Sequence, residues 1–318
     1  MKIVVLDGYT LNPGDNPWTE LESLGDLQVY ERTASTQLLE RAAGADVLIT
    51  NKTVIDRNSI GQLSRLKFIA VLATGYNVVD VAAARESEVP VSNVPTYGTN
   101  AVAQHAFAML LSVVHGIREH DQAVKAGEWA AADDFCFWKV PPFELAGRTM
   151  GIVGAGRIGL ATARLAISFG MKVLGHSRSR RESLDDPNFS FAELEQVFSD
   201  ADVISLHCPA TPETEGMINR DSINLMKRSA ILINTARGTL VNENDLAEAL
   251  KQKRIAAACL DVLSTEPPAK DNPLIGLSNC IVTPHIAWAA LEARKRLMAT
   301  TVDNVRGFLN GTPVNVVN

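Results

Sequence analysis

Three side chains that suit acid–base chemistry occur late in the sequence, each close to an apolar, strand-like run. They are Arg237, Glu266 and His285. A guanidinium group binds a carboxylate and a neighbouring carbonyl through paired hydrogen bonds, and an imidazolium donates a proton to that carbonyl. A nearby glutamate favours the imidazolium form. Each residue alone has an ordinary interpretation, as a surface cation, a loop carboxylate or a hydrogen-bonded histidine, but together they predict reduction of a 2-keto acid to a 2-hydroxy acid.

A glycine-rich turn suggests where the reducing equivalent is held. The run Gly154-Ala-Gly156-Arg157-Ile158-Gly159 has the pattern G-x-G-x-x-G, with an apolar strand-like segment before it and an Ala-rich helical segment after it. In this context the first glycine makes the tight turn, the second lets the backbone approach phosphates, and the third lets the helix pack on its strand. The helix N-terminus adds free N–H groups and partial positive charge. The run predicts a dinucleotide site.

The residues after the next expected strand, at 171–176, bear on the identity of the dinucleotide. NAD sites carry an acidic residue there for the ribose hydroxyls. This chain instead has Ser177, Arg178 and Ser179, followed by two more arginines and then Glu182. Guanidinium groups bind a 2′-phosphate through charge-assisted hydrogen bonds. We therefore expect NADP in preference to NAD, with NAD as the other possibility and a solvated basic loop as the alternative interpretation.

The composition indicates a globular chain with few classes of partner. The 318 residues are 46% hydrophobic and 21% charged, and 30 basic against 36 acidic side chains leave a net charge of −6. No nucleic-acid or membrane partner is expected from this balance. The four cysteines lack metal-ligand spacing, so no metal is expected, and with no signal-peptide pattern at the N-terminus we expect a cytoplasmic protein.

Strand-like runs alternate with helical ones along the chain, as is typical of parallel sheets covered on both faces. Strands are expected at residues 2–6, 27–30, 47–50, 68–72 and 89–91, and then at 150–153, 172–175, 203–206, 230–234, 257–262 and 280–283. Helices are expected at 100–118 and 292–309. The fold class is therefore α/β, with two doubly wound, Rossmann-like domains.

The last helix decides the domain boundaries. By residue 292 no strand remains in the second domain for a helix to cover, so we expect the chain to return to the first. The substrate (catalytic) domain is then discontinuous, at 1–98 and 289–318, and the dinucleotide-binding domain at 99–288 is inserted into it. The three acid–base residues follow strands of the inserted domain, at the edge where open α/β sheets bind ligands.

The whole chain resembles the D-isomer-specific 2-hydroxyacid dehydrogenase family, in the branch of glycerate dehydrogenases and hydroxypyruvate reductases. The motifs that carry the resemblance are the glycine-rich turn and the runs at 202–214, 234–238, 261–267 and 284–288. The resemblance implies an NAD(P)-dependent enzyme acting on a small 2-keto acid or D-2-hydroxy acid, with hydroxypyruvate or glyoxylate as the expected substrate.

The resemblance also implies roles for individual residues. Arg237 and His285 would bind the substrate together with the backbone of Thr74 and Gly75, and Glu266 would tune His285 as the acid/base. The further cofactor-binding residues that the resemblance implies are His207, Cys208, Pro209, Thr235, Ala236 and Asp261. Among these, Asp261 would bind the nicotinamide carboxamide. Asn51 and Lys52 either line the same pocket or belong to an ordinary loop. Ser177, Arg178 and Ser179 are expected to bind the cofactor from their residue types, and they depart from the family, in which many relatives carry an acid there.

Aromatic residues concentrate at 129–138, ahead of the glycine-rich turn. In the family the segment that corresponds to 129–138 supports a homodimer, so we expect a homodimer here. Trp138 of one subunit would reach the substrate pocket of the other and favour compact substrates. A local hydrophobic plug is the alternative. Alternative functions are another D-2-hydroxyacid dehydrogenase, of the D-lactate or phosphoglycerate type, or a dinucleotide-sensing scaffold without catalysis.

Overall fold

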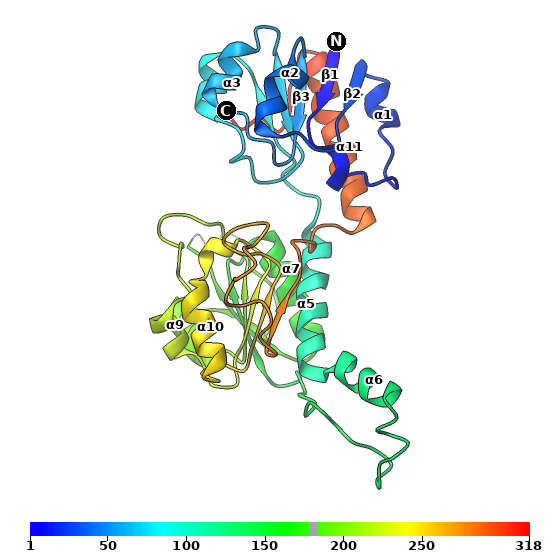
Figure 1. Cartoon of the computed structure of the whole chain (residues 1–318). Helices are drawn as coiled ribbons and strands as arrows, with labels where there is room; N and C mark the ends of the chain where they lie inside the picture. Colours follow the sequence, from blue (N-terminus) through cyan, green and yellow to red (C-terminus); the bar gives the residue numbers. More distant parts are fainter. Residues whose placement is uncertain (179–182) are drawn as a thin grey trace. The chain divides into compact units, whose positions relative to one another are not determined.

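The computed structural model describes residues 1–178 and 183–318, and the chain divides into two compact units. The first contains Met1–Gly98 and Trp288–Asn318, and the second contains Thr99–Ala287. Each unit is built on one sheet whose paired strands all run parallel (Figure 1). The prediction of two parallel α/β units is thus confirmed.

The first unit has a five-stranded sheet in the order β2-β1-β3-β4-β5. The strands are β1 (Lys2–Val5), β2 (Asp26–Val29), β3 (Val47–Thr50), β4 (Phe68–Val71) and β5 (Val91–Ser92). One face is covered by α2 (Leu38–Ala42), α3 (Arg57–Gln62) and α4 (Val81–Glu86). The other is covered by α1 (Thr19–Glu22) and α11 (Leu291–Leu309). The C-terminal helix therefore belongs to the core of the first unit.

The second unit has a seven-stranded sheet in the order β12-β11-β10-β9-β6-β7-β8. The strands are β6 (Thr149–Val153), β7 (Lys172–His176), β8 (Phe189–Phe191), β9 (Val203–Leu206), β10 (Ile231–Asn234), β11 (Ala257–Leu260) and β12 (Cys280–Val282). The strand order reverses between β6 and β9, and such a reversal is where open α/β sheets bind ligands. The glycine-rich turn follows β6, directly at this point.

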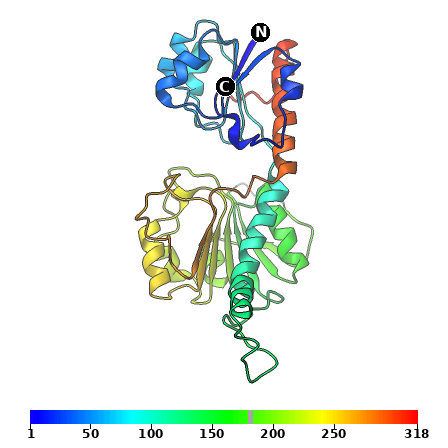
Figure 2. The same ribbon diagram turned by 45° about the vertical axis from the view of Figure 1, so that its right-hand side comes forward.

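Helices cover both faces of the second sheet, as Figure 2 shows. On one face lie α5 (Thr99–His115) and α7 (Arg157–Ser168). On the other lie α8 (Leu194–Asp200), α9 (Arg220–Leu225) and α10 (Glu243–Lys251). Burial on both faces explains why β9, β10 and β11 are buried at every position and mostly apolar, with Ser205 and Asn234 as the polar residues among them. Short 3-10 turns at Gly8–Thr10, Ser35–Gln37 and Gly238–Leu240 complete the two units.

Two expectations from the sequence were wrong in detail. The helix expected at 100–118 ends at His115, and a second helix, α6 (Ile117–Lys125), begins after Gly116, whose φ of +52° breaks the first. A Cβ on Gly116 would lie 2.8 Å from the Cβ of Val140, so the packing also requires glycine there. The second sheet has a seventh strand, β8, which is only three residues long, so its apolar–polar alternation is too short to be recognised as a strand.

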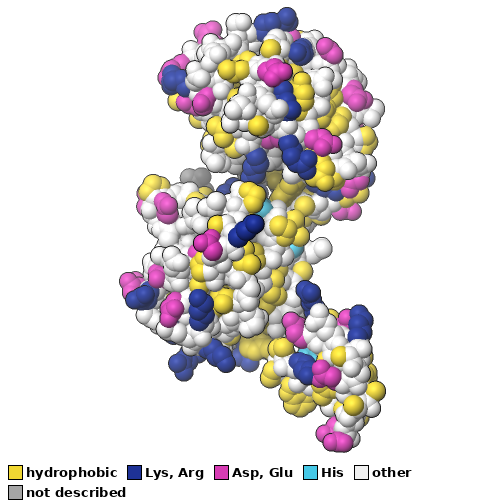
Figure 3. Space-filling model, in the orientation of Figure 1, with side chains coloured by type: hydrophobic (Ala, Val, Ile, Leu, Met, Phe, Trp, Pro, Cys, Tyr) yellow, Lys and Arg dark blue, Asp and Glu magenta, His cyan; other side chains and the backbone are white. Residues whose placement is uncertain are grey.

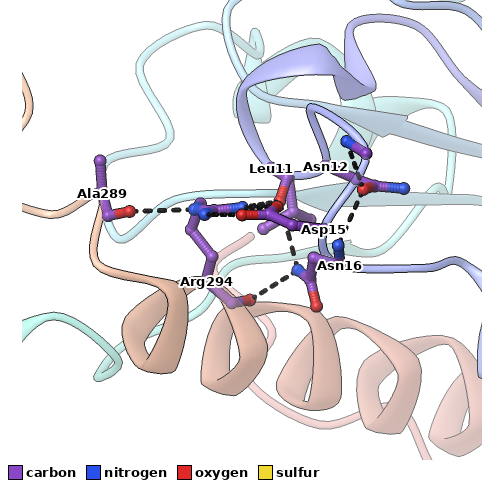
Figure 4. Close-up of polar contacts among 7 residues, drawn as sticks. Leu11, Asn12, Asp15, Asn16, Ala289 and Arg294 are labelled. Carbon is purple, nitrogen blue, oxygen red and sulfur yellow. Dashed lines mark hydrogen bonds and ion pairs between the residues drawn. The ribbon is translucent and has the colours of Figure 1, made fainter.

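Within the first unit, Arg294 ties the start of α11 to the loop after β1 (Figure 4). Its guanidinium donates to both carboxylate oxygens of Asp15, at 2.5 and 2.7 Å, and to the carbonyl oxygens of Leu11 and Ala289. The hydrogen bond from Arg294 holds the pKa of Asp15 below its ordinary value. This bidentate pair fixes the segment by which the chain re-enters the first unit.

No single helix in the described part of the chain is long and apolar enough to cross a membrane. The pair α5 and α6, bent by 52° at the break, meets the length and composition criteria only when the two helices are taken together.

Candidate active site

The glycine-rich turn leaves β6 in a conformation that depends on its glycines. Gly154 has a φ of +101°, and its N–H donates to the carbonyl of His176 at 2.8 Å. A Cβ on Gly154 would lie 2.4 Å from the backbone N of Cys208, and one on Gly159 would lie 2.2 Å from the carbonyl oxygen of Gly154. By contrast, a Cβ on Gly156 would meet nothing within 4 Å. Gly154 and Gly159 shape the turn, while Gly156 leaves open space in front of it.

The residues around this turn fit a dinucleotide. Helix α7 begins at Arg157 with Gly156 as its N-cap, and among the described residues no N-cap side chain accepts from its first N–H groups. Such a helix start binds phosphate oxygens. In the first turn of this helix, Arg157 is exposed and Ile158 is half buried. Thr235 directly follows β10. Its hydroxyl is buried without a hydrogen-bond partner among the described residues. A buried polar atom of this kind is expected where a ligand supplies the partner.

The segment after β7 carries the residues expected to set the choice of dinucleotide. Ser177 is half buried and Arg178 is exposed, whereas Ser179 lies outside the described residues. Burial raises the pKa of the Cys208 thiol, and the charge of Arg178 partly offsets this.

That segment, His207-Cys208-Pro209, follows β9 on the other side of the glycine-rich turn. His207 accepts or donates a hydrogen bond at 2.9 Å to the hydroxyl of Ser205, and burial lowers the pKa of His207 to about 4. The imidazole is therefore neutral at pH 7. Positive charge for an anion at this edge comes from the α7 N-terminus and Arg178 instead.

The turn after β10 is held by the buried side chain of Asn234. Its amide donates to the carbonyl of Arg237 at 2.8 Å, and its carbonyl accepts from the N–H of Ala236 at 3.0 Å. Arg237 is exposed at the tip of this turn. A Cβ on the next residue, Gly238, would lie 1.9 Å from the carbonyl carbon of Leu263, so only glycine lets this turn contact the segment after β11.

The structure brings Glu266 and His285 together. Glu266 Oε2 and His285 Nδ1 are 2.6 Å apart, and Oε1 accepts from the N–H of Leu263 at 3.1 Å. One oxygen of the Glu266 carboxylate is thus bound by a backbone N–H group, and the other oxygen is hydrogen-bonded to the imidazole of His285. With Nδ1 engaged, Nε2 is the ring nitrogen left to exchange a proton with a ligand.

Asp261 is 1% exposed and directly follows β11. Its Oδ1 accepts from the hydroxyl of Thr283 at 2.6 Å and from the N–H of Ile286 at 2.9 Å, and Oδ2 accepts from the N–H of Ala287 at 2.8 Å. Asp261 therefore holds the turn that carries His285. Its expected contact with a carboxamide stays a prediction.

In the first unit, the segment after β4 carries Thr74 and Gly75. The hydroxyl of Thr74 donates to the carbonyl of Val94 at 2.8 Å, and the Thr74 carbonyl accepts from the side chain of Asn93 at 2.7 Å. Neither the Thr74 nor the Gly75 N–H has an acceptor among the described residues, which leaves both available to a carboxylate.

The loop after β3 is held by Asp7, at the end of β1. Its carboxylate accepts from the N–H groups of Asn51, Lys52 and Thr53 at 2.6–2.7 Å. The amide of Asn51 donates to the carbonyl of Leu72, whereas the Lys52 side chain is exposed. Asn51 thus has a structural role, and Lys52 lies at the carboxyl edge of this sheet.

Sequence reasoning gave no role to several residues that support these side chains, namely Asp7, His105, Asn234, Gly238 and Thr283. The signals were present in part, because Asn234 and Gly238 flank Arg237 and Thr283 lies two residues before His285. His105 and Asp7 gave no local signal. His105 contacts Thr283, and Asp7 contacts residues 51–53, all far away in sequence.

Comparison with known proteins agrees with this geometry. Residues 107–287 match the NAD binding domain of the D-isomer specific 2-hydroxyacid dehydrogenases. The chain is 50% identical over 321 residues to a hydroxypyruvate reductase of Blautia hydrogenotrophica, covering all of both chains. It is 40% identical to a glycerate dehydrogenase of Methylorubrum extorquens, over 99% of this chain and 98% of the relative.

Among solved structures, an acyclic imino acid reductase in complex with NADPH and D-Arg superimposes with a TM-score of 0.88, at 34% identity and full coverage of both chains. The sequence relatives, the match to the NAD binding domain and the parallel-sheet architecture all point to one family of nicotinamide-dinucleotide enzymes. The chain belongs to the D-isomer-specific 2-hydroxyacid dehydrogenase family, in its branch of glycerate dehydrogenases and hydroxypyruvate reductases.

Proposed function

We propose that this enzyme reduces hydroxypyruvate to D-glycerate, using NADPH in preference to NADH. The observation that carries the proposal is the Glu266–His285 pair, 2.6 Å apart, at the carboxyl edge of the sheet that also presents Arg237. A carboxylate-supported imidazole beside a guanidinium group suits a substrate with a carboxylate next to a carbonyl. The 50% identity to a hydroxypyruvate reductase supports this substrate over other 2-keto acids.

Each residue of the site has a distinct part in the proposed reaction. Arg237 binds the substrate carboxylate and the neighbouring carbonyl oxygen. In the first unit we propose Thr74 and Gly75 as substrate-binding residues, because their N–H groups have no acceptor among the described residues and suit a carboxylate. A nicotinamide dinucleotide held at the glycine-rich turn would supply the hydride that the carbonyl carbon accepts. His285 Nε2 gives its proton to the carbonyl oxygen, and Glu266 stabilises the positive charge that the imidazole carries before transfer.

The preference for NADPH rests on Arg178. It is exposed directly after β7, where an acidic residue would bind the ribose of NAD, and Ser177 precedes it. A neutral His207 adds no charge there. The imino acid reductase at 34% identity was solved with NADPH, which supports the same preference. For the remaining cofactor contacts we propose Gly154, Gly156, Gly159 and the segments at 207–209 and 235–236.

We also propose that the enzyme is a homodimer and acts in the cytoplasm. Large apolar side chains are exposed along and after α6, as the yellow patches in Figure 3 illustrate. Trp129 is 52%, Phe135 89% and Trp138 61% exposed. A groove of about 560 Å³ between α5 and α7 adds apolar surface, to which the exposed side chain of Phe169 contributes. Exposed aromatic residues of this kind anchor protein–protein interfaces.

The cytoplasmic location is proposed because all four cysteines are free thiols.

The catalytic proposal is tested by initial rates with hydroxypyruvate, glyoxylate, pyruvate and 3-phosphohydroxypyruvate. We expect hydroxypyruvate to be the best substrate, and His285→Gln to lower kcat about 100-fold or more, because general acid catalysis is lost. His115→Gln, on the exposed end of α5, is the matched control. Absence of turnover with every 2-keto acid would contradict the proposal and favour the sensing scaffold.

The cofactor preference is tested with Arg178→Ala. We expect kcat/KM for NADPH to fall roughly tenfold or more while kcat/KM for NADH changes little, since one charge-assisted hydrogen bond to the 2′-phosphate is removed. Arg228→Ala, an exposed arginine that precedes β10 and so lies near the opposite edge of the sheet, is the control. An unchanged NADPH-to-NADH ratio in Arg178→Ala would refute the assignment.

The dimer is tested on the wild-type protein, and the role of Trp138 is tested with Trp138→Ala. Light scattering on the wild-type protein should give about 69 kDa, twice the 34.3 kDa of one chain. If Trp138 limits the size of the substrate, the variant should lose part of its preference for hydroxypyruvate over longer 2-keto acids. A monomeric wild type would contradict the dimer, and an unchanged preference would contradict the role of Trp138.

A further inference from the structure

A chain of polar groups extends from α5 to the turn that carries His285. His105 Nε2, on α5, lies 3.1 Å from the hydroxyl oxygen of Thr283 and 3.5 Å from Asp261 Oδ1. Thr283 Oγ1 is in turn 2.6 Å from Asp261 Oδ1. None of these three residues has a place in the proposed reaction so far, and Asp261 is expected only to contact the cofactor. The side chains of His105 and Asp261 are nevertheless only 21% and 1% exposed.

The direction of the hydrogen bonds follows from the charge of Asp261. Burial alone would raise the pKa of its carboxyl group, but the hydrogen bonds from His105, Thr283 and two backbone N–H groups outweigh it and lower the pKa. The carboxylate is therefore ionised at neutral pH and accepts only. The Thr283 hydroxyl gives its proton to Asp261, so its own oxygen accepts from His105, which must carry its proton on Nε2.

The Asp261 carboxylate, at the end of this series of hydrogen bonds, holds a turn of strained backbone. His285 has a φ of +53°, a left-handed conformation that few residues other than glycine adopt. Its N–H donates to the Asp261 carbonyl at 2.8 Å, and the Asp261 carboxylate accepts from the next two N–H groups, of Ile286 and Ala287. Conformations of this kind persist when surrounding hydrogen bonds over-determine them.

We propose that His105 and Thr283 are positioning residues for proton transfer. They orient the Asp261 carboxylate, which holds the left-handed turn at His285, and the turn aims the imidazole while Glu266 fixes its rotation. The proposal rests on the proposed function, in which His285 is the acid. It adds a second support for the same imidazole, through the backbone, and it places one end of that support on helix α5 rather than in the loops of the site.

Two pairs of variants separate the hydrogen bonds from packing. Thr283→Val removes the hydroxyl at nearly constant volume, and Thr283→Ser keeps it. His105→Leu removes the ring N–H, and His105→Gln offers a side-chain N–H at a similar reach from the helix. Thr301→Val, a buried threonine of α11 that donates within its own helix, is the matched control for loss of a buried hydroxyl.

The first readout does not depend on catalysis. Amide hydrogen exchange at Ile286 and Ala287, measured by NMR on the ligand-free protein, reports on the two N–H groups that Asp261 holds. We expect protection at these two amides to fall in Thr283→Val and His105→Leu. It should fall much less in Thr283→Ser and His105→Gln, and stay unchanged in Thr301→Val.

The second readout is the split between kcat and KM. We expect Thr283→Val and His105→Leu to lower kcat with hydroxypyruvate by roughly tenfold or more, because small misplacements of an acid are costly, while KM changes less. The conservative variants should recover most of this loss. Equal loss of activity in each pair, or full amide protection in Thr283→Val and His105→Leu, would overturn the proposal.

The two readouts also separate this proposal from the proposed function. A wild type without 2-keto acid reduction, together with the expected changes in amide protection, would reject the substrate assignment but keep the positioning of the turn. Normal wild-type turnover with unchanged protection and kcat in all four variants would reject the positioning role alone.

Discussion

The alignment of parallel strands is the constraint on which this active site depends. Because every strand of the second sheet runs in one direction, all their carboxyl ends meet at one edge, and the segments that leave β6, β9, β10, β11 and β12 begin there. Residues separated by more than a hundred positions in sequence, such as Gly154 and His285, are thereby placed on one side of one sheet.

Close backbone approach is the second requirement, and glycine meets it. Gly154 contacts the segment after β9, and Gly238 contacts the segment after β11. A methyl group at either position would push apart two neighbouring loops of the edge. The same loops are then fixed by buried polar side chains, Asn234 for the turn at Arg237 and Asp261 for the turn at His285. The exposed functional groups are thus carried on backbone that is itself held rigidly.

Much of this arrangement was predictable from sequence because its signals are local. The continuous apolar strands, the glycine-rich turn after β6 and the order of Arg237, Glu266 and His285 can each be recognised within a short window. The break at Gly116 was missed because Ile117 extends the apolar run of α5 by one residue beyond the glycine, whereas the close packing that excludes a Cβ at Gly116 involves Val140, a residue distant in sequence. Strand β8 was missed because it is short and lies at the sheet edge.

The supporting residues were beyond sequence reasoning for a related reason. His105 lies in a helix whose apolar pattern explains the helix completely, and its partner Thr283 is 178 residues away. Asp7 holds a loop 44 residues away through backbone N–H groups, which have no signature in side-chain type. Such contacts depend on the tertiary structure, although the residues they support are recognisable.

The most direct test of the whole account is the effect of Glu266→Gln on kcat with hydroxypyruvate. A glutamine can still accept a hydrogen bond from His285 Nδ1, but it does not stabilise the positive charge of the imidazolium. The account predicts a loss in kcat of about tenfold or more with a small change in KM, and retention of the folded structure. An unchanged kcat would contradict the claim that the Glu266–His285 pair is the proton donor of this enzyme.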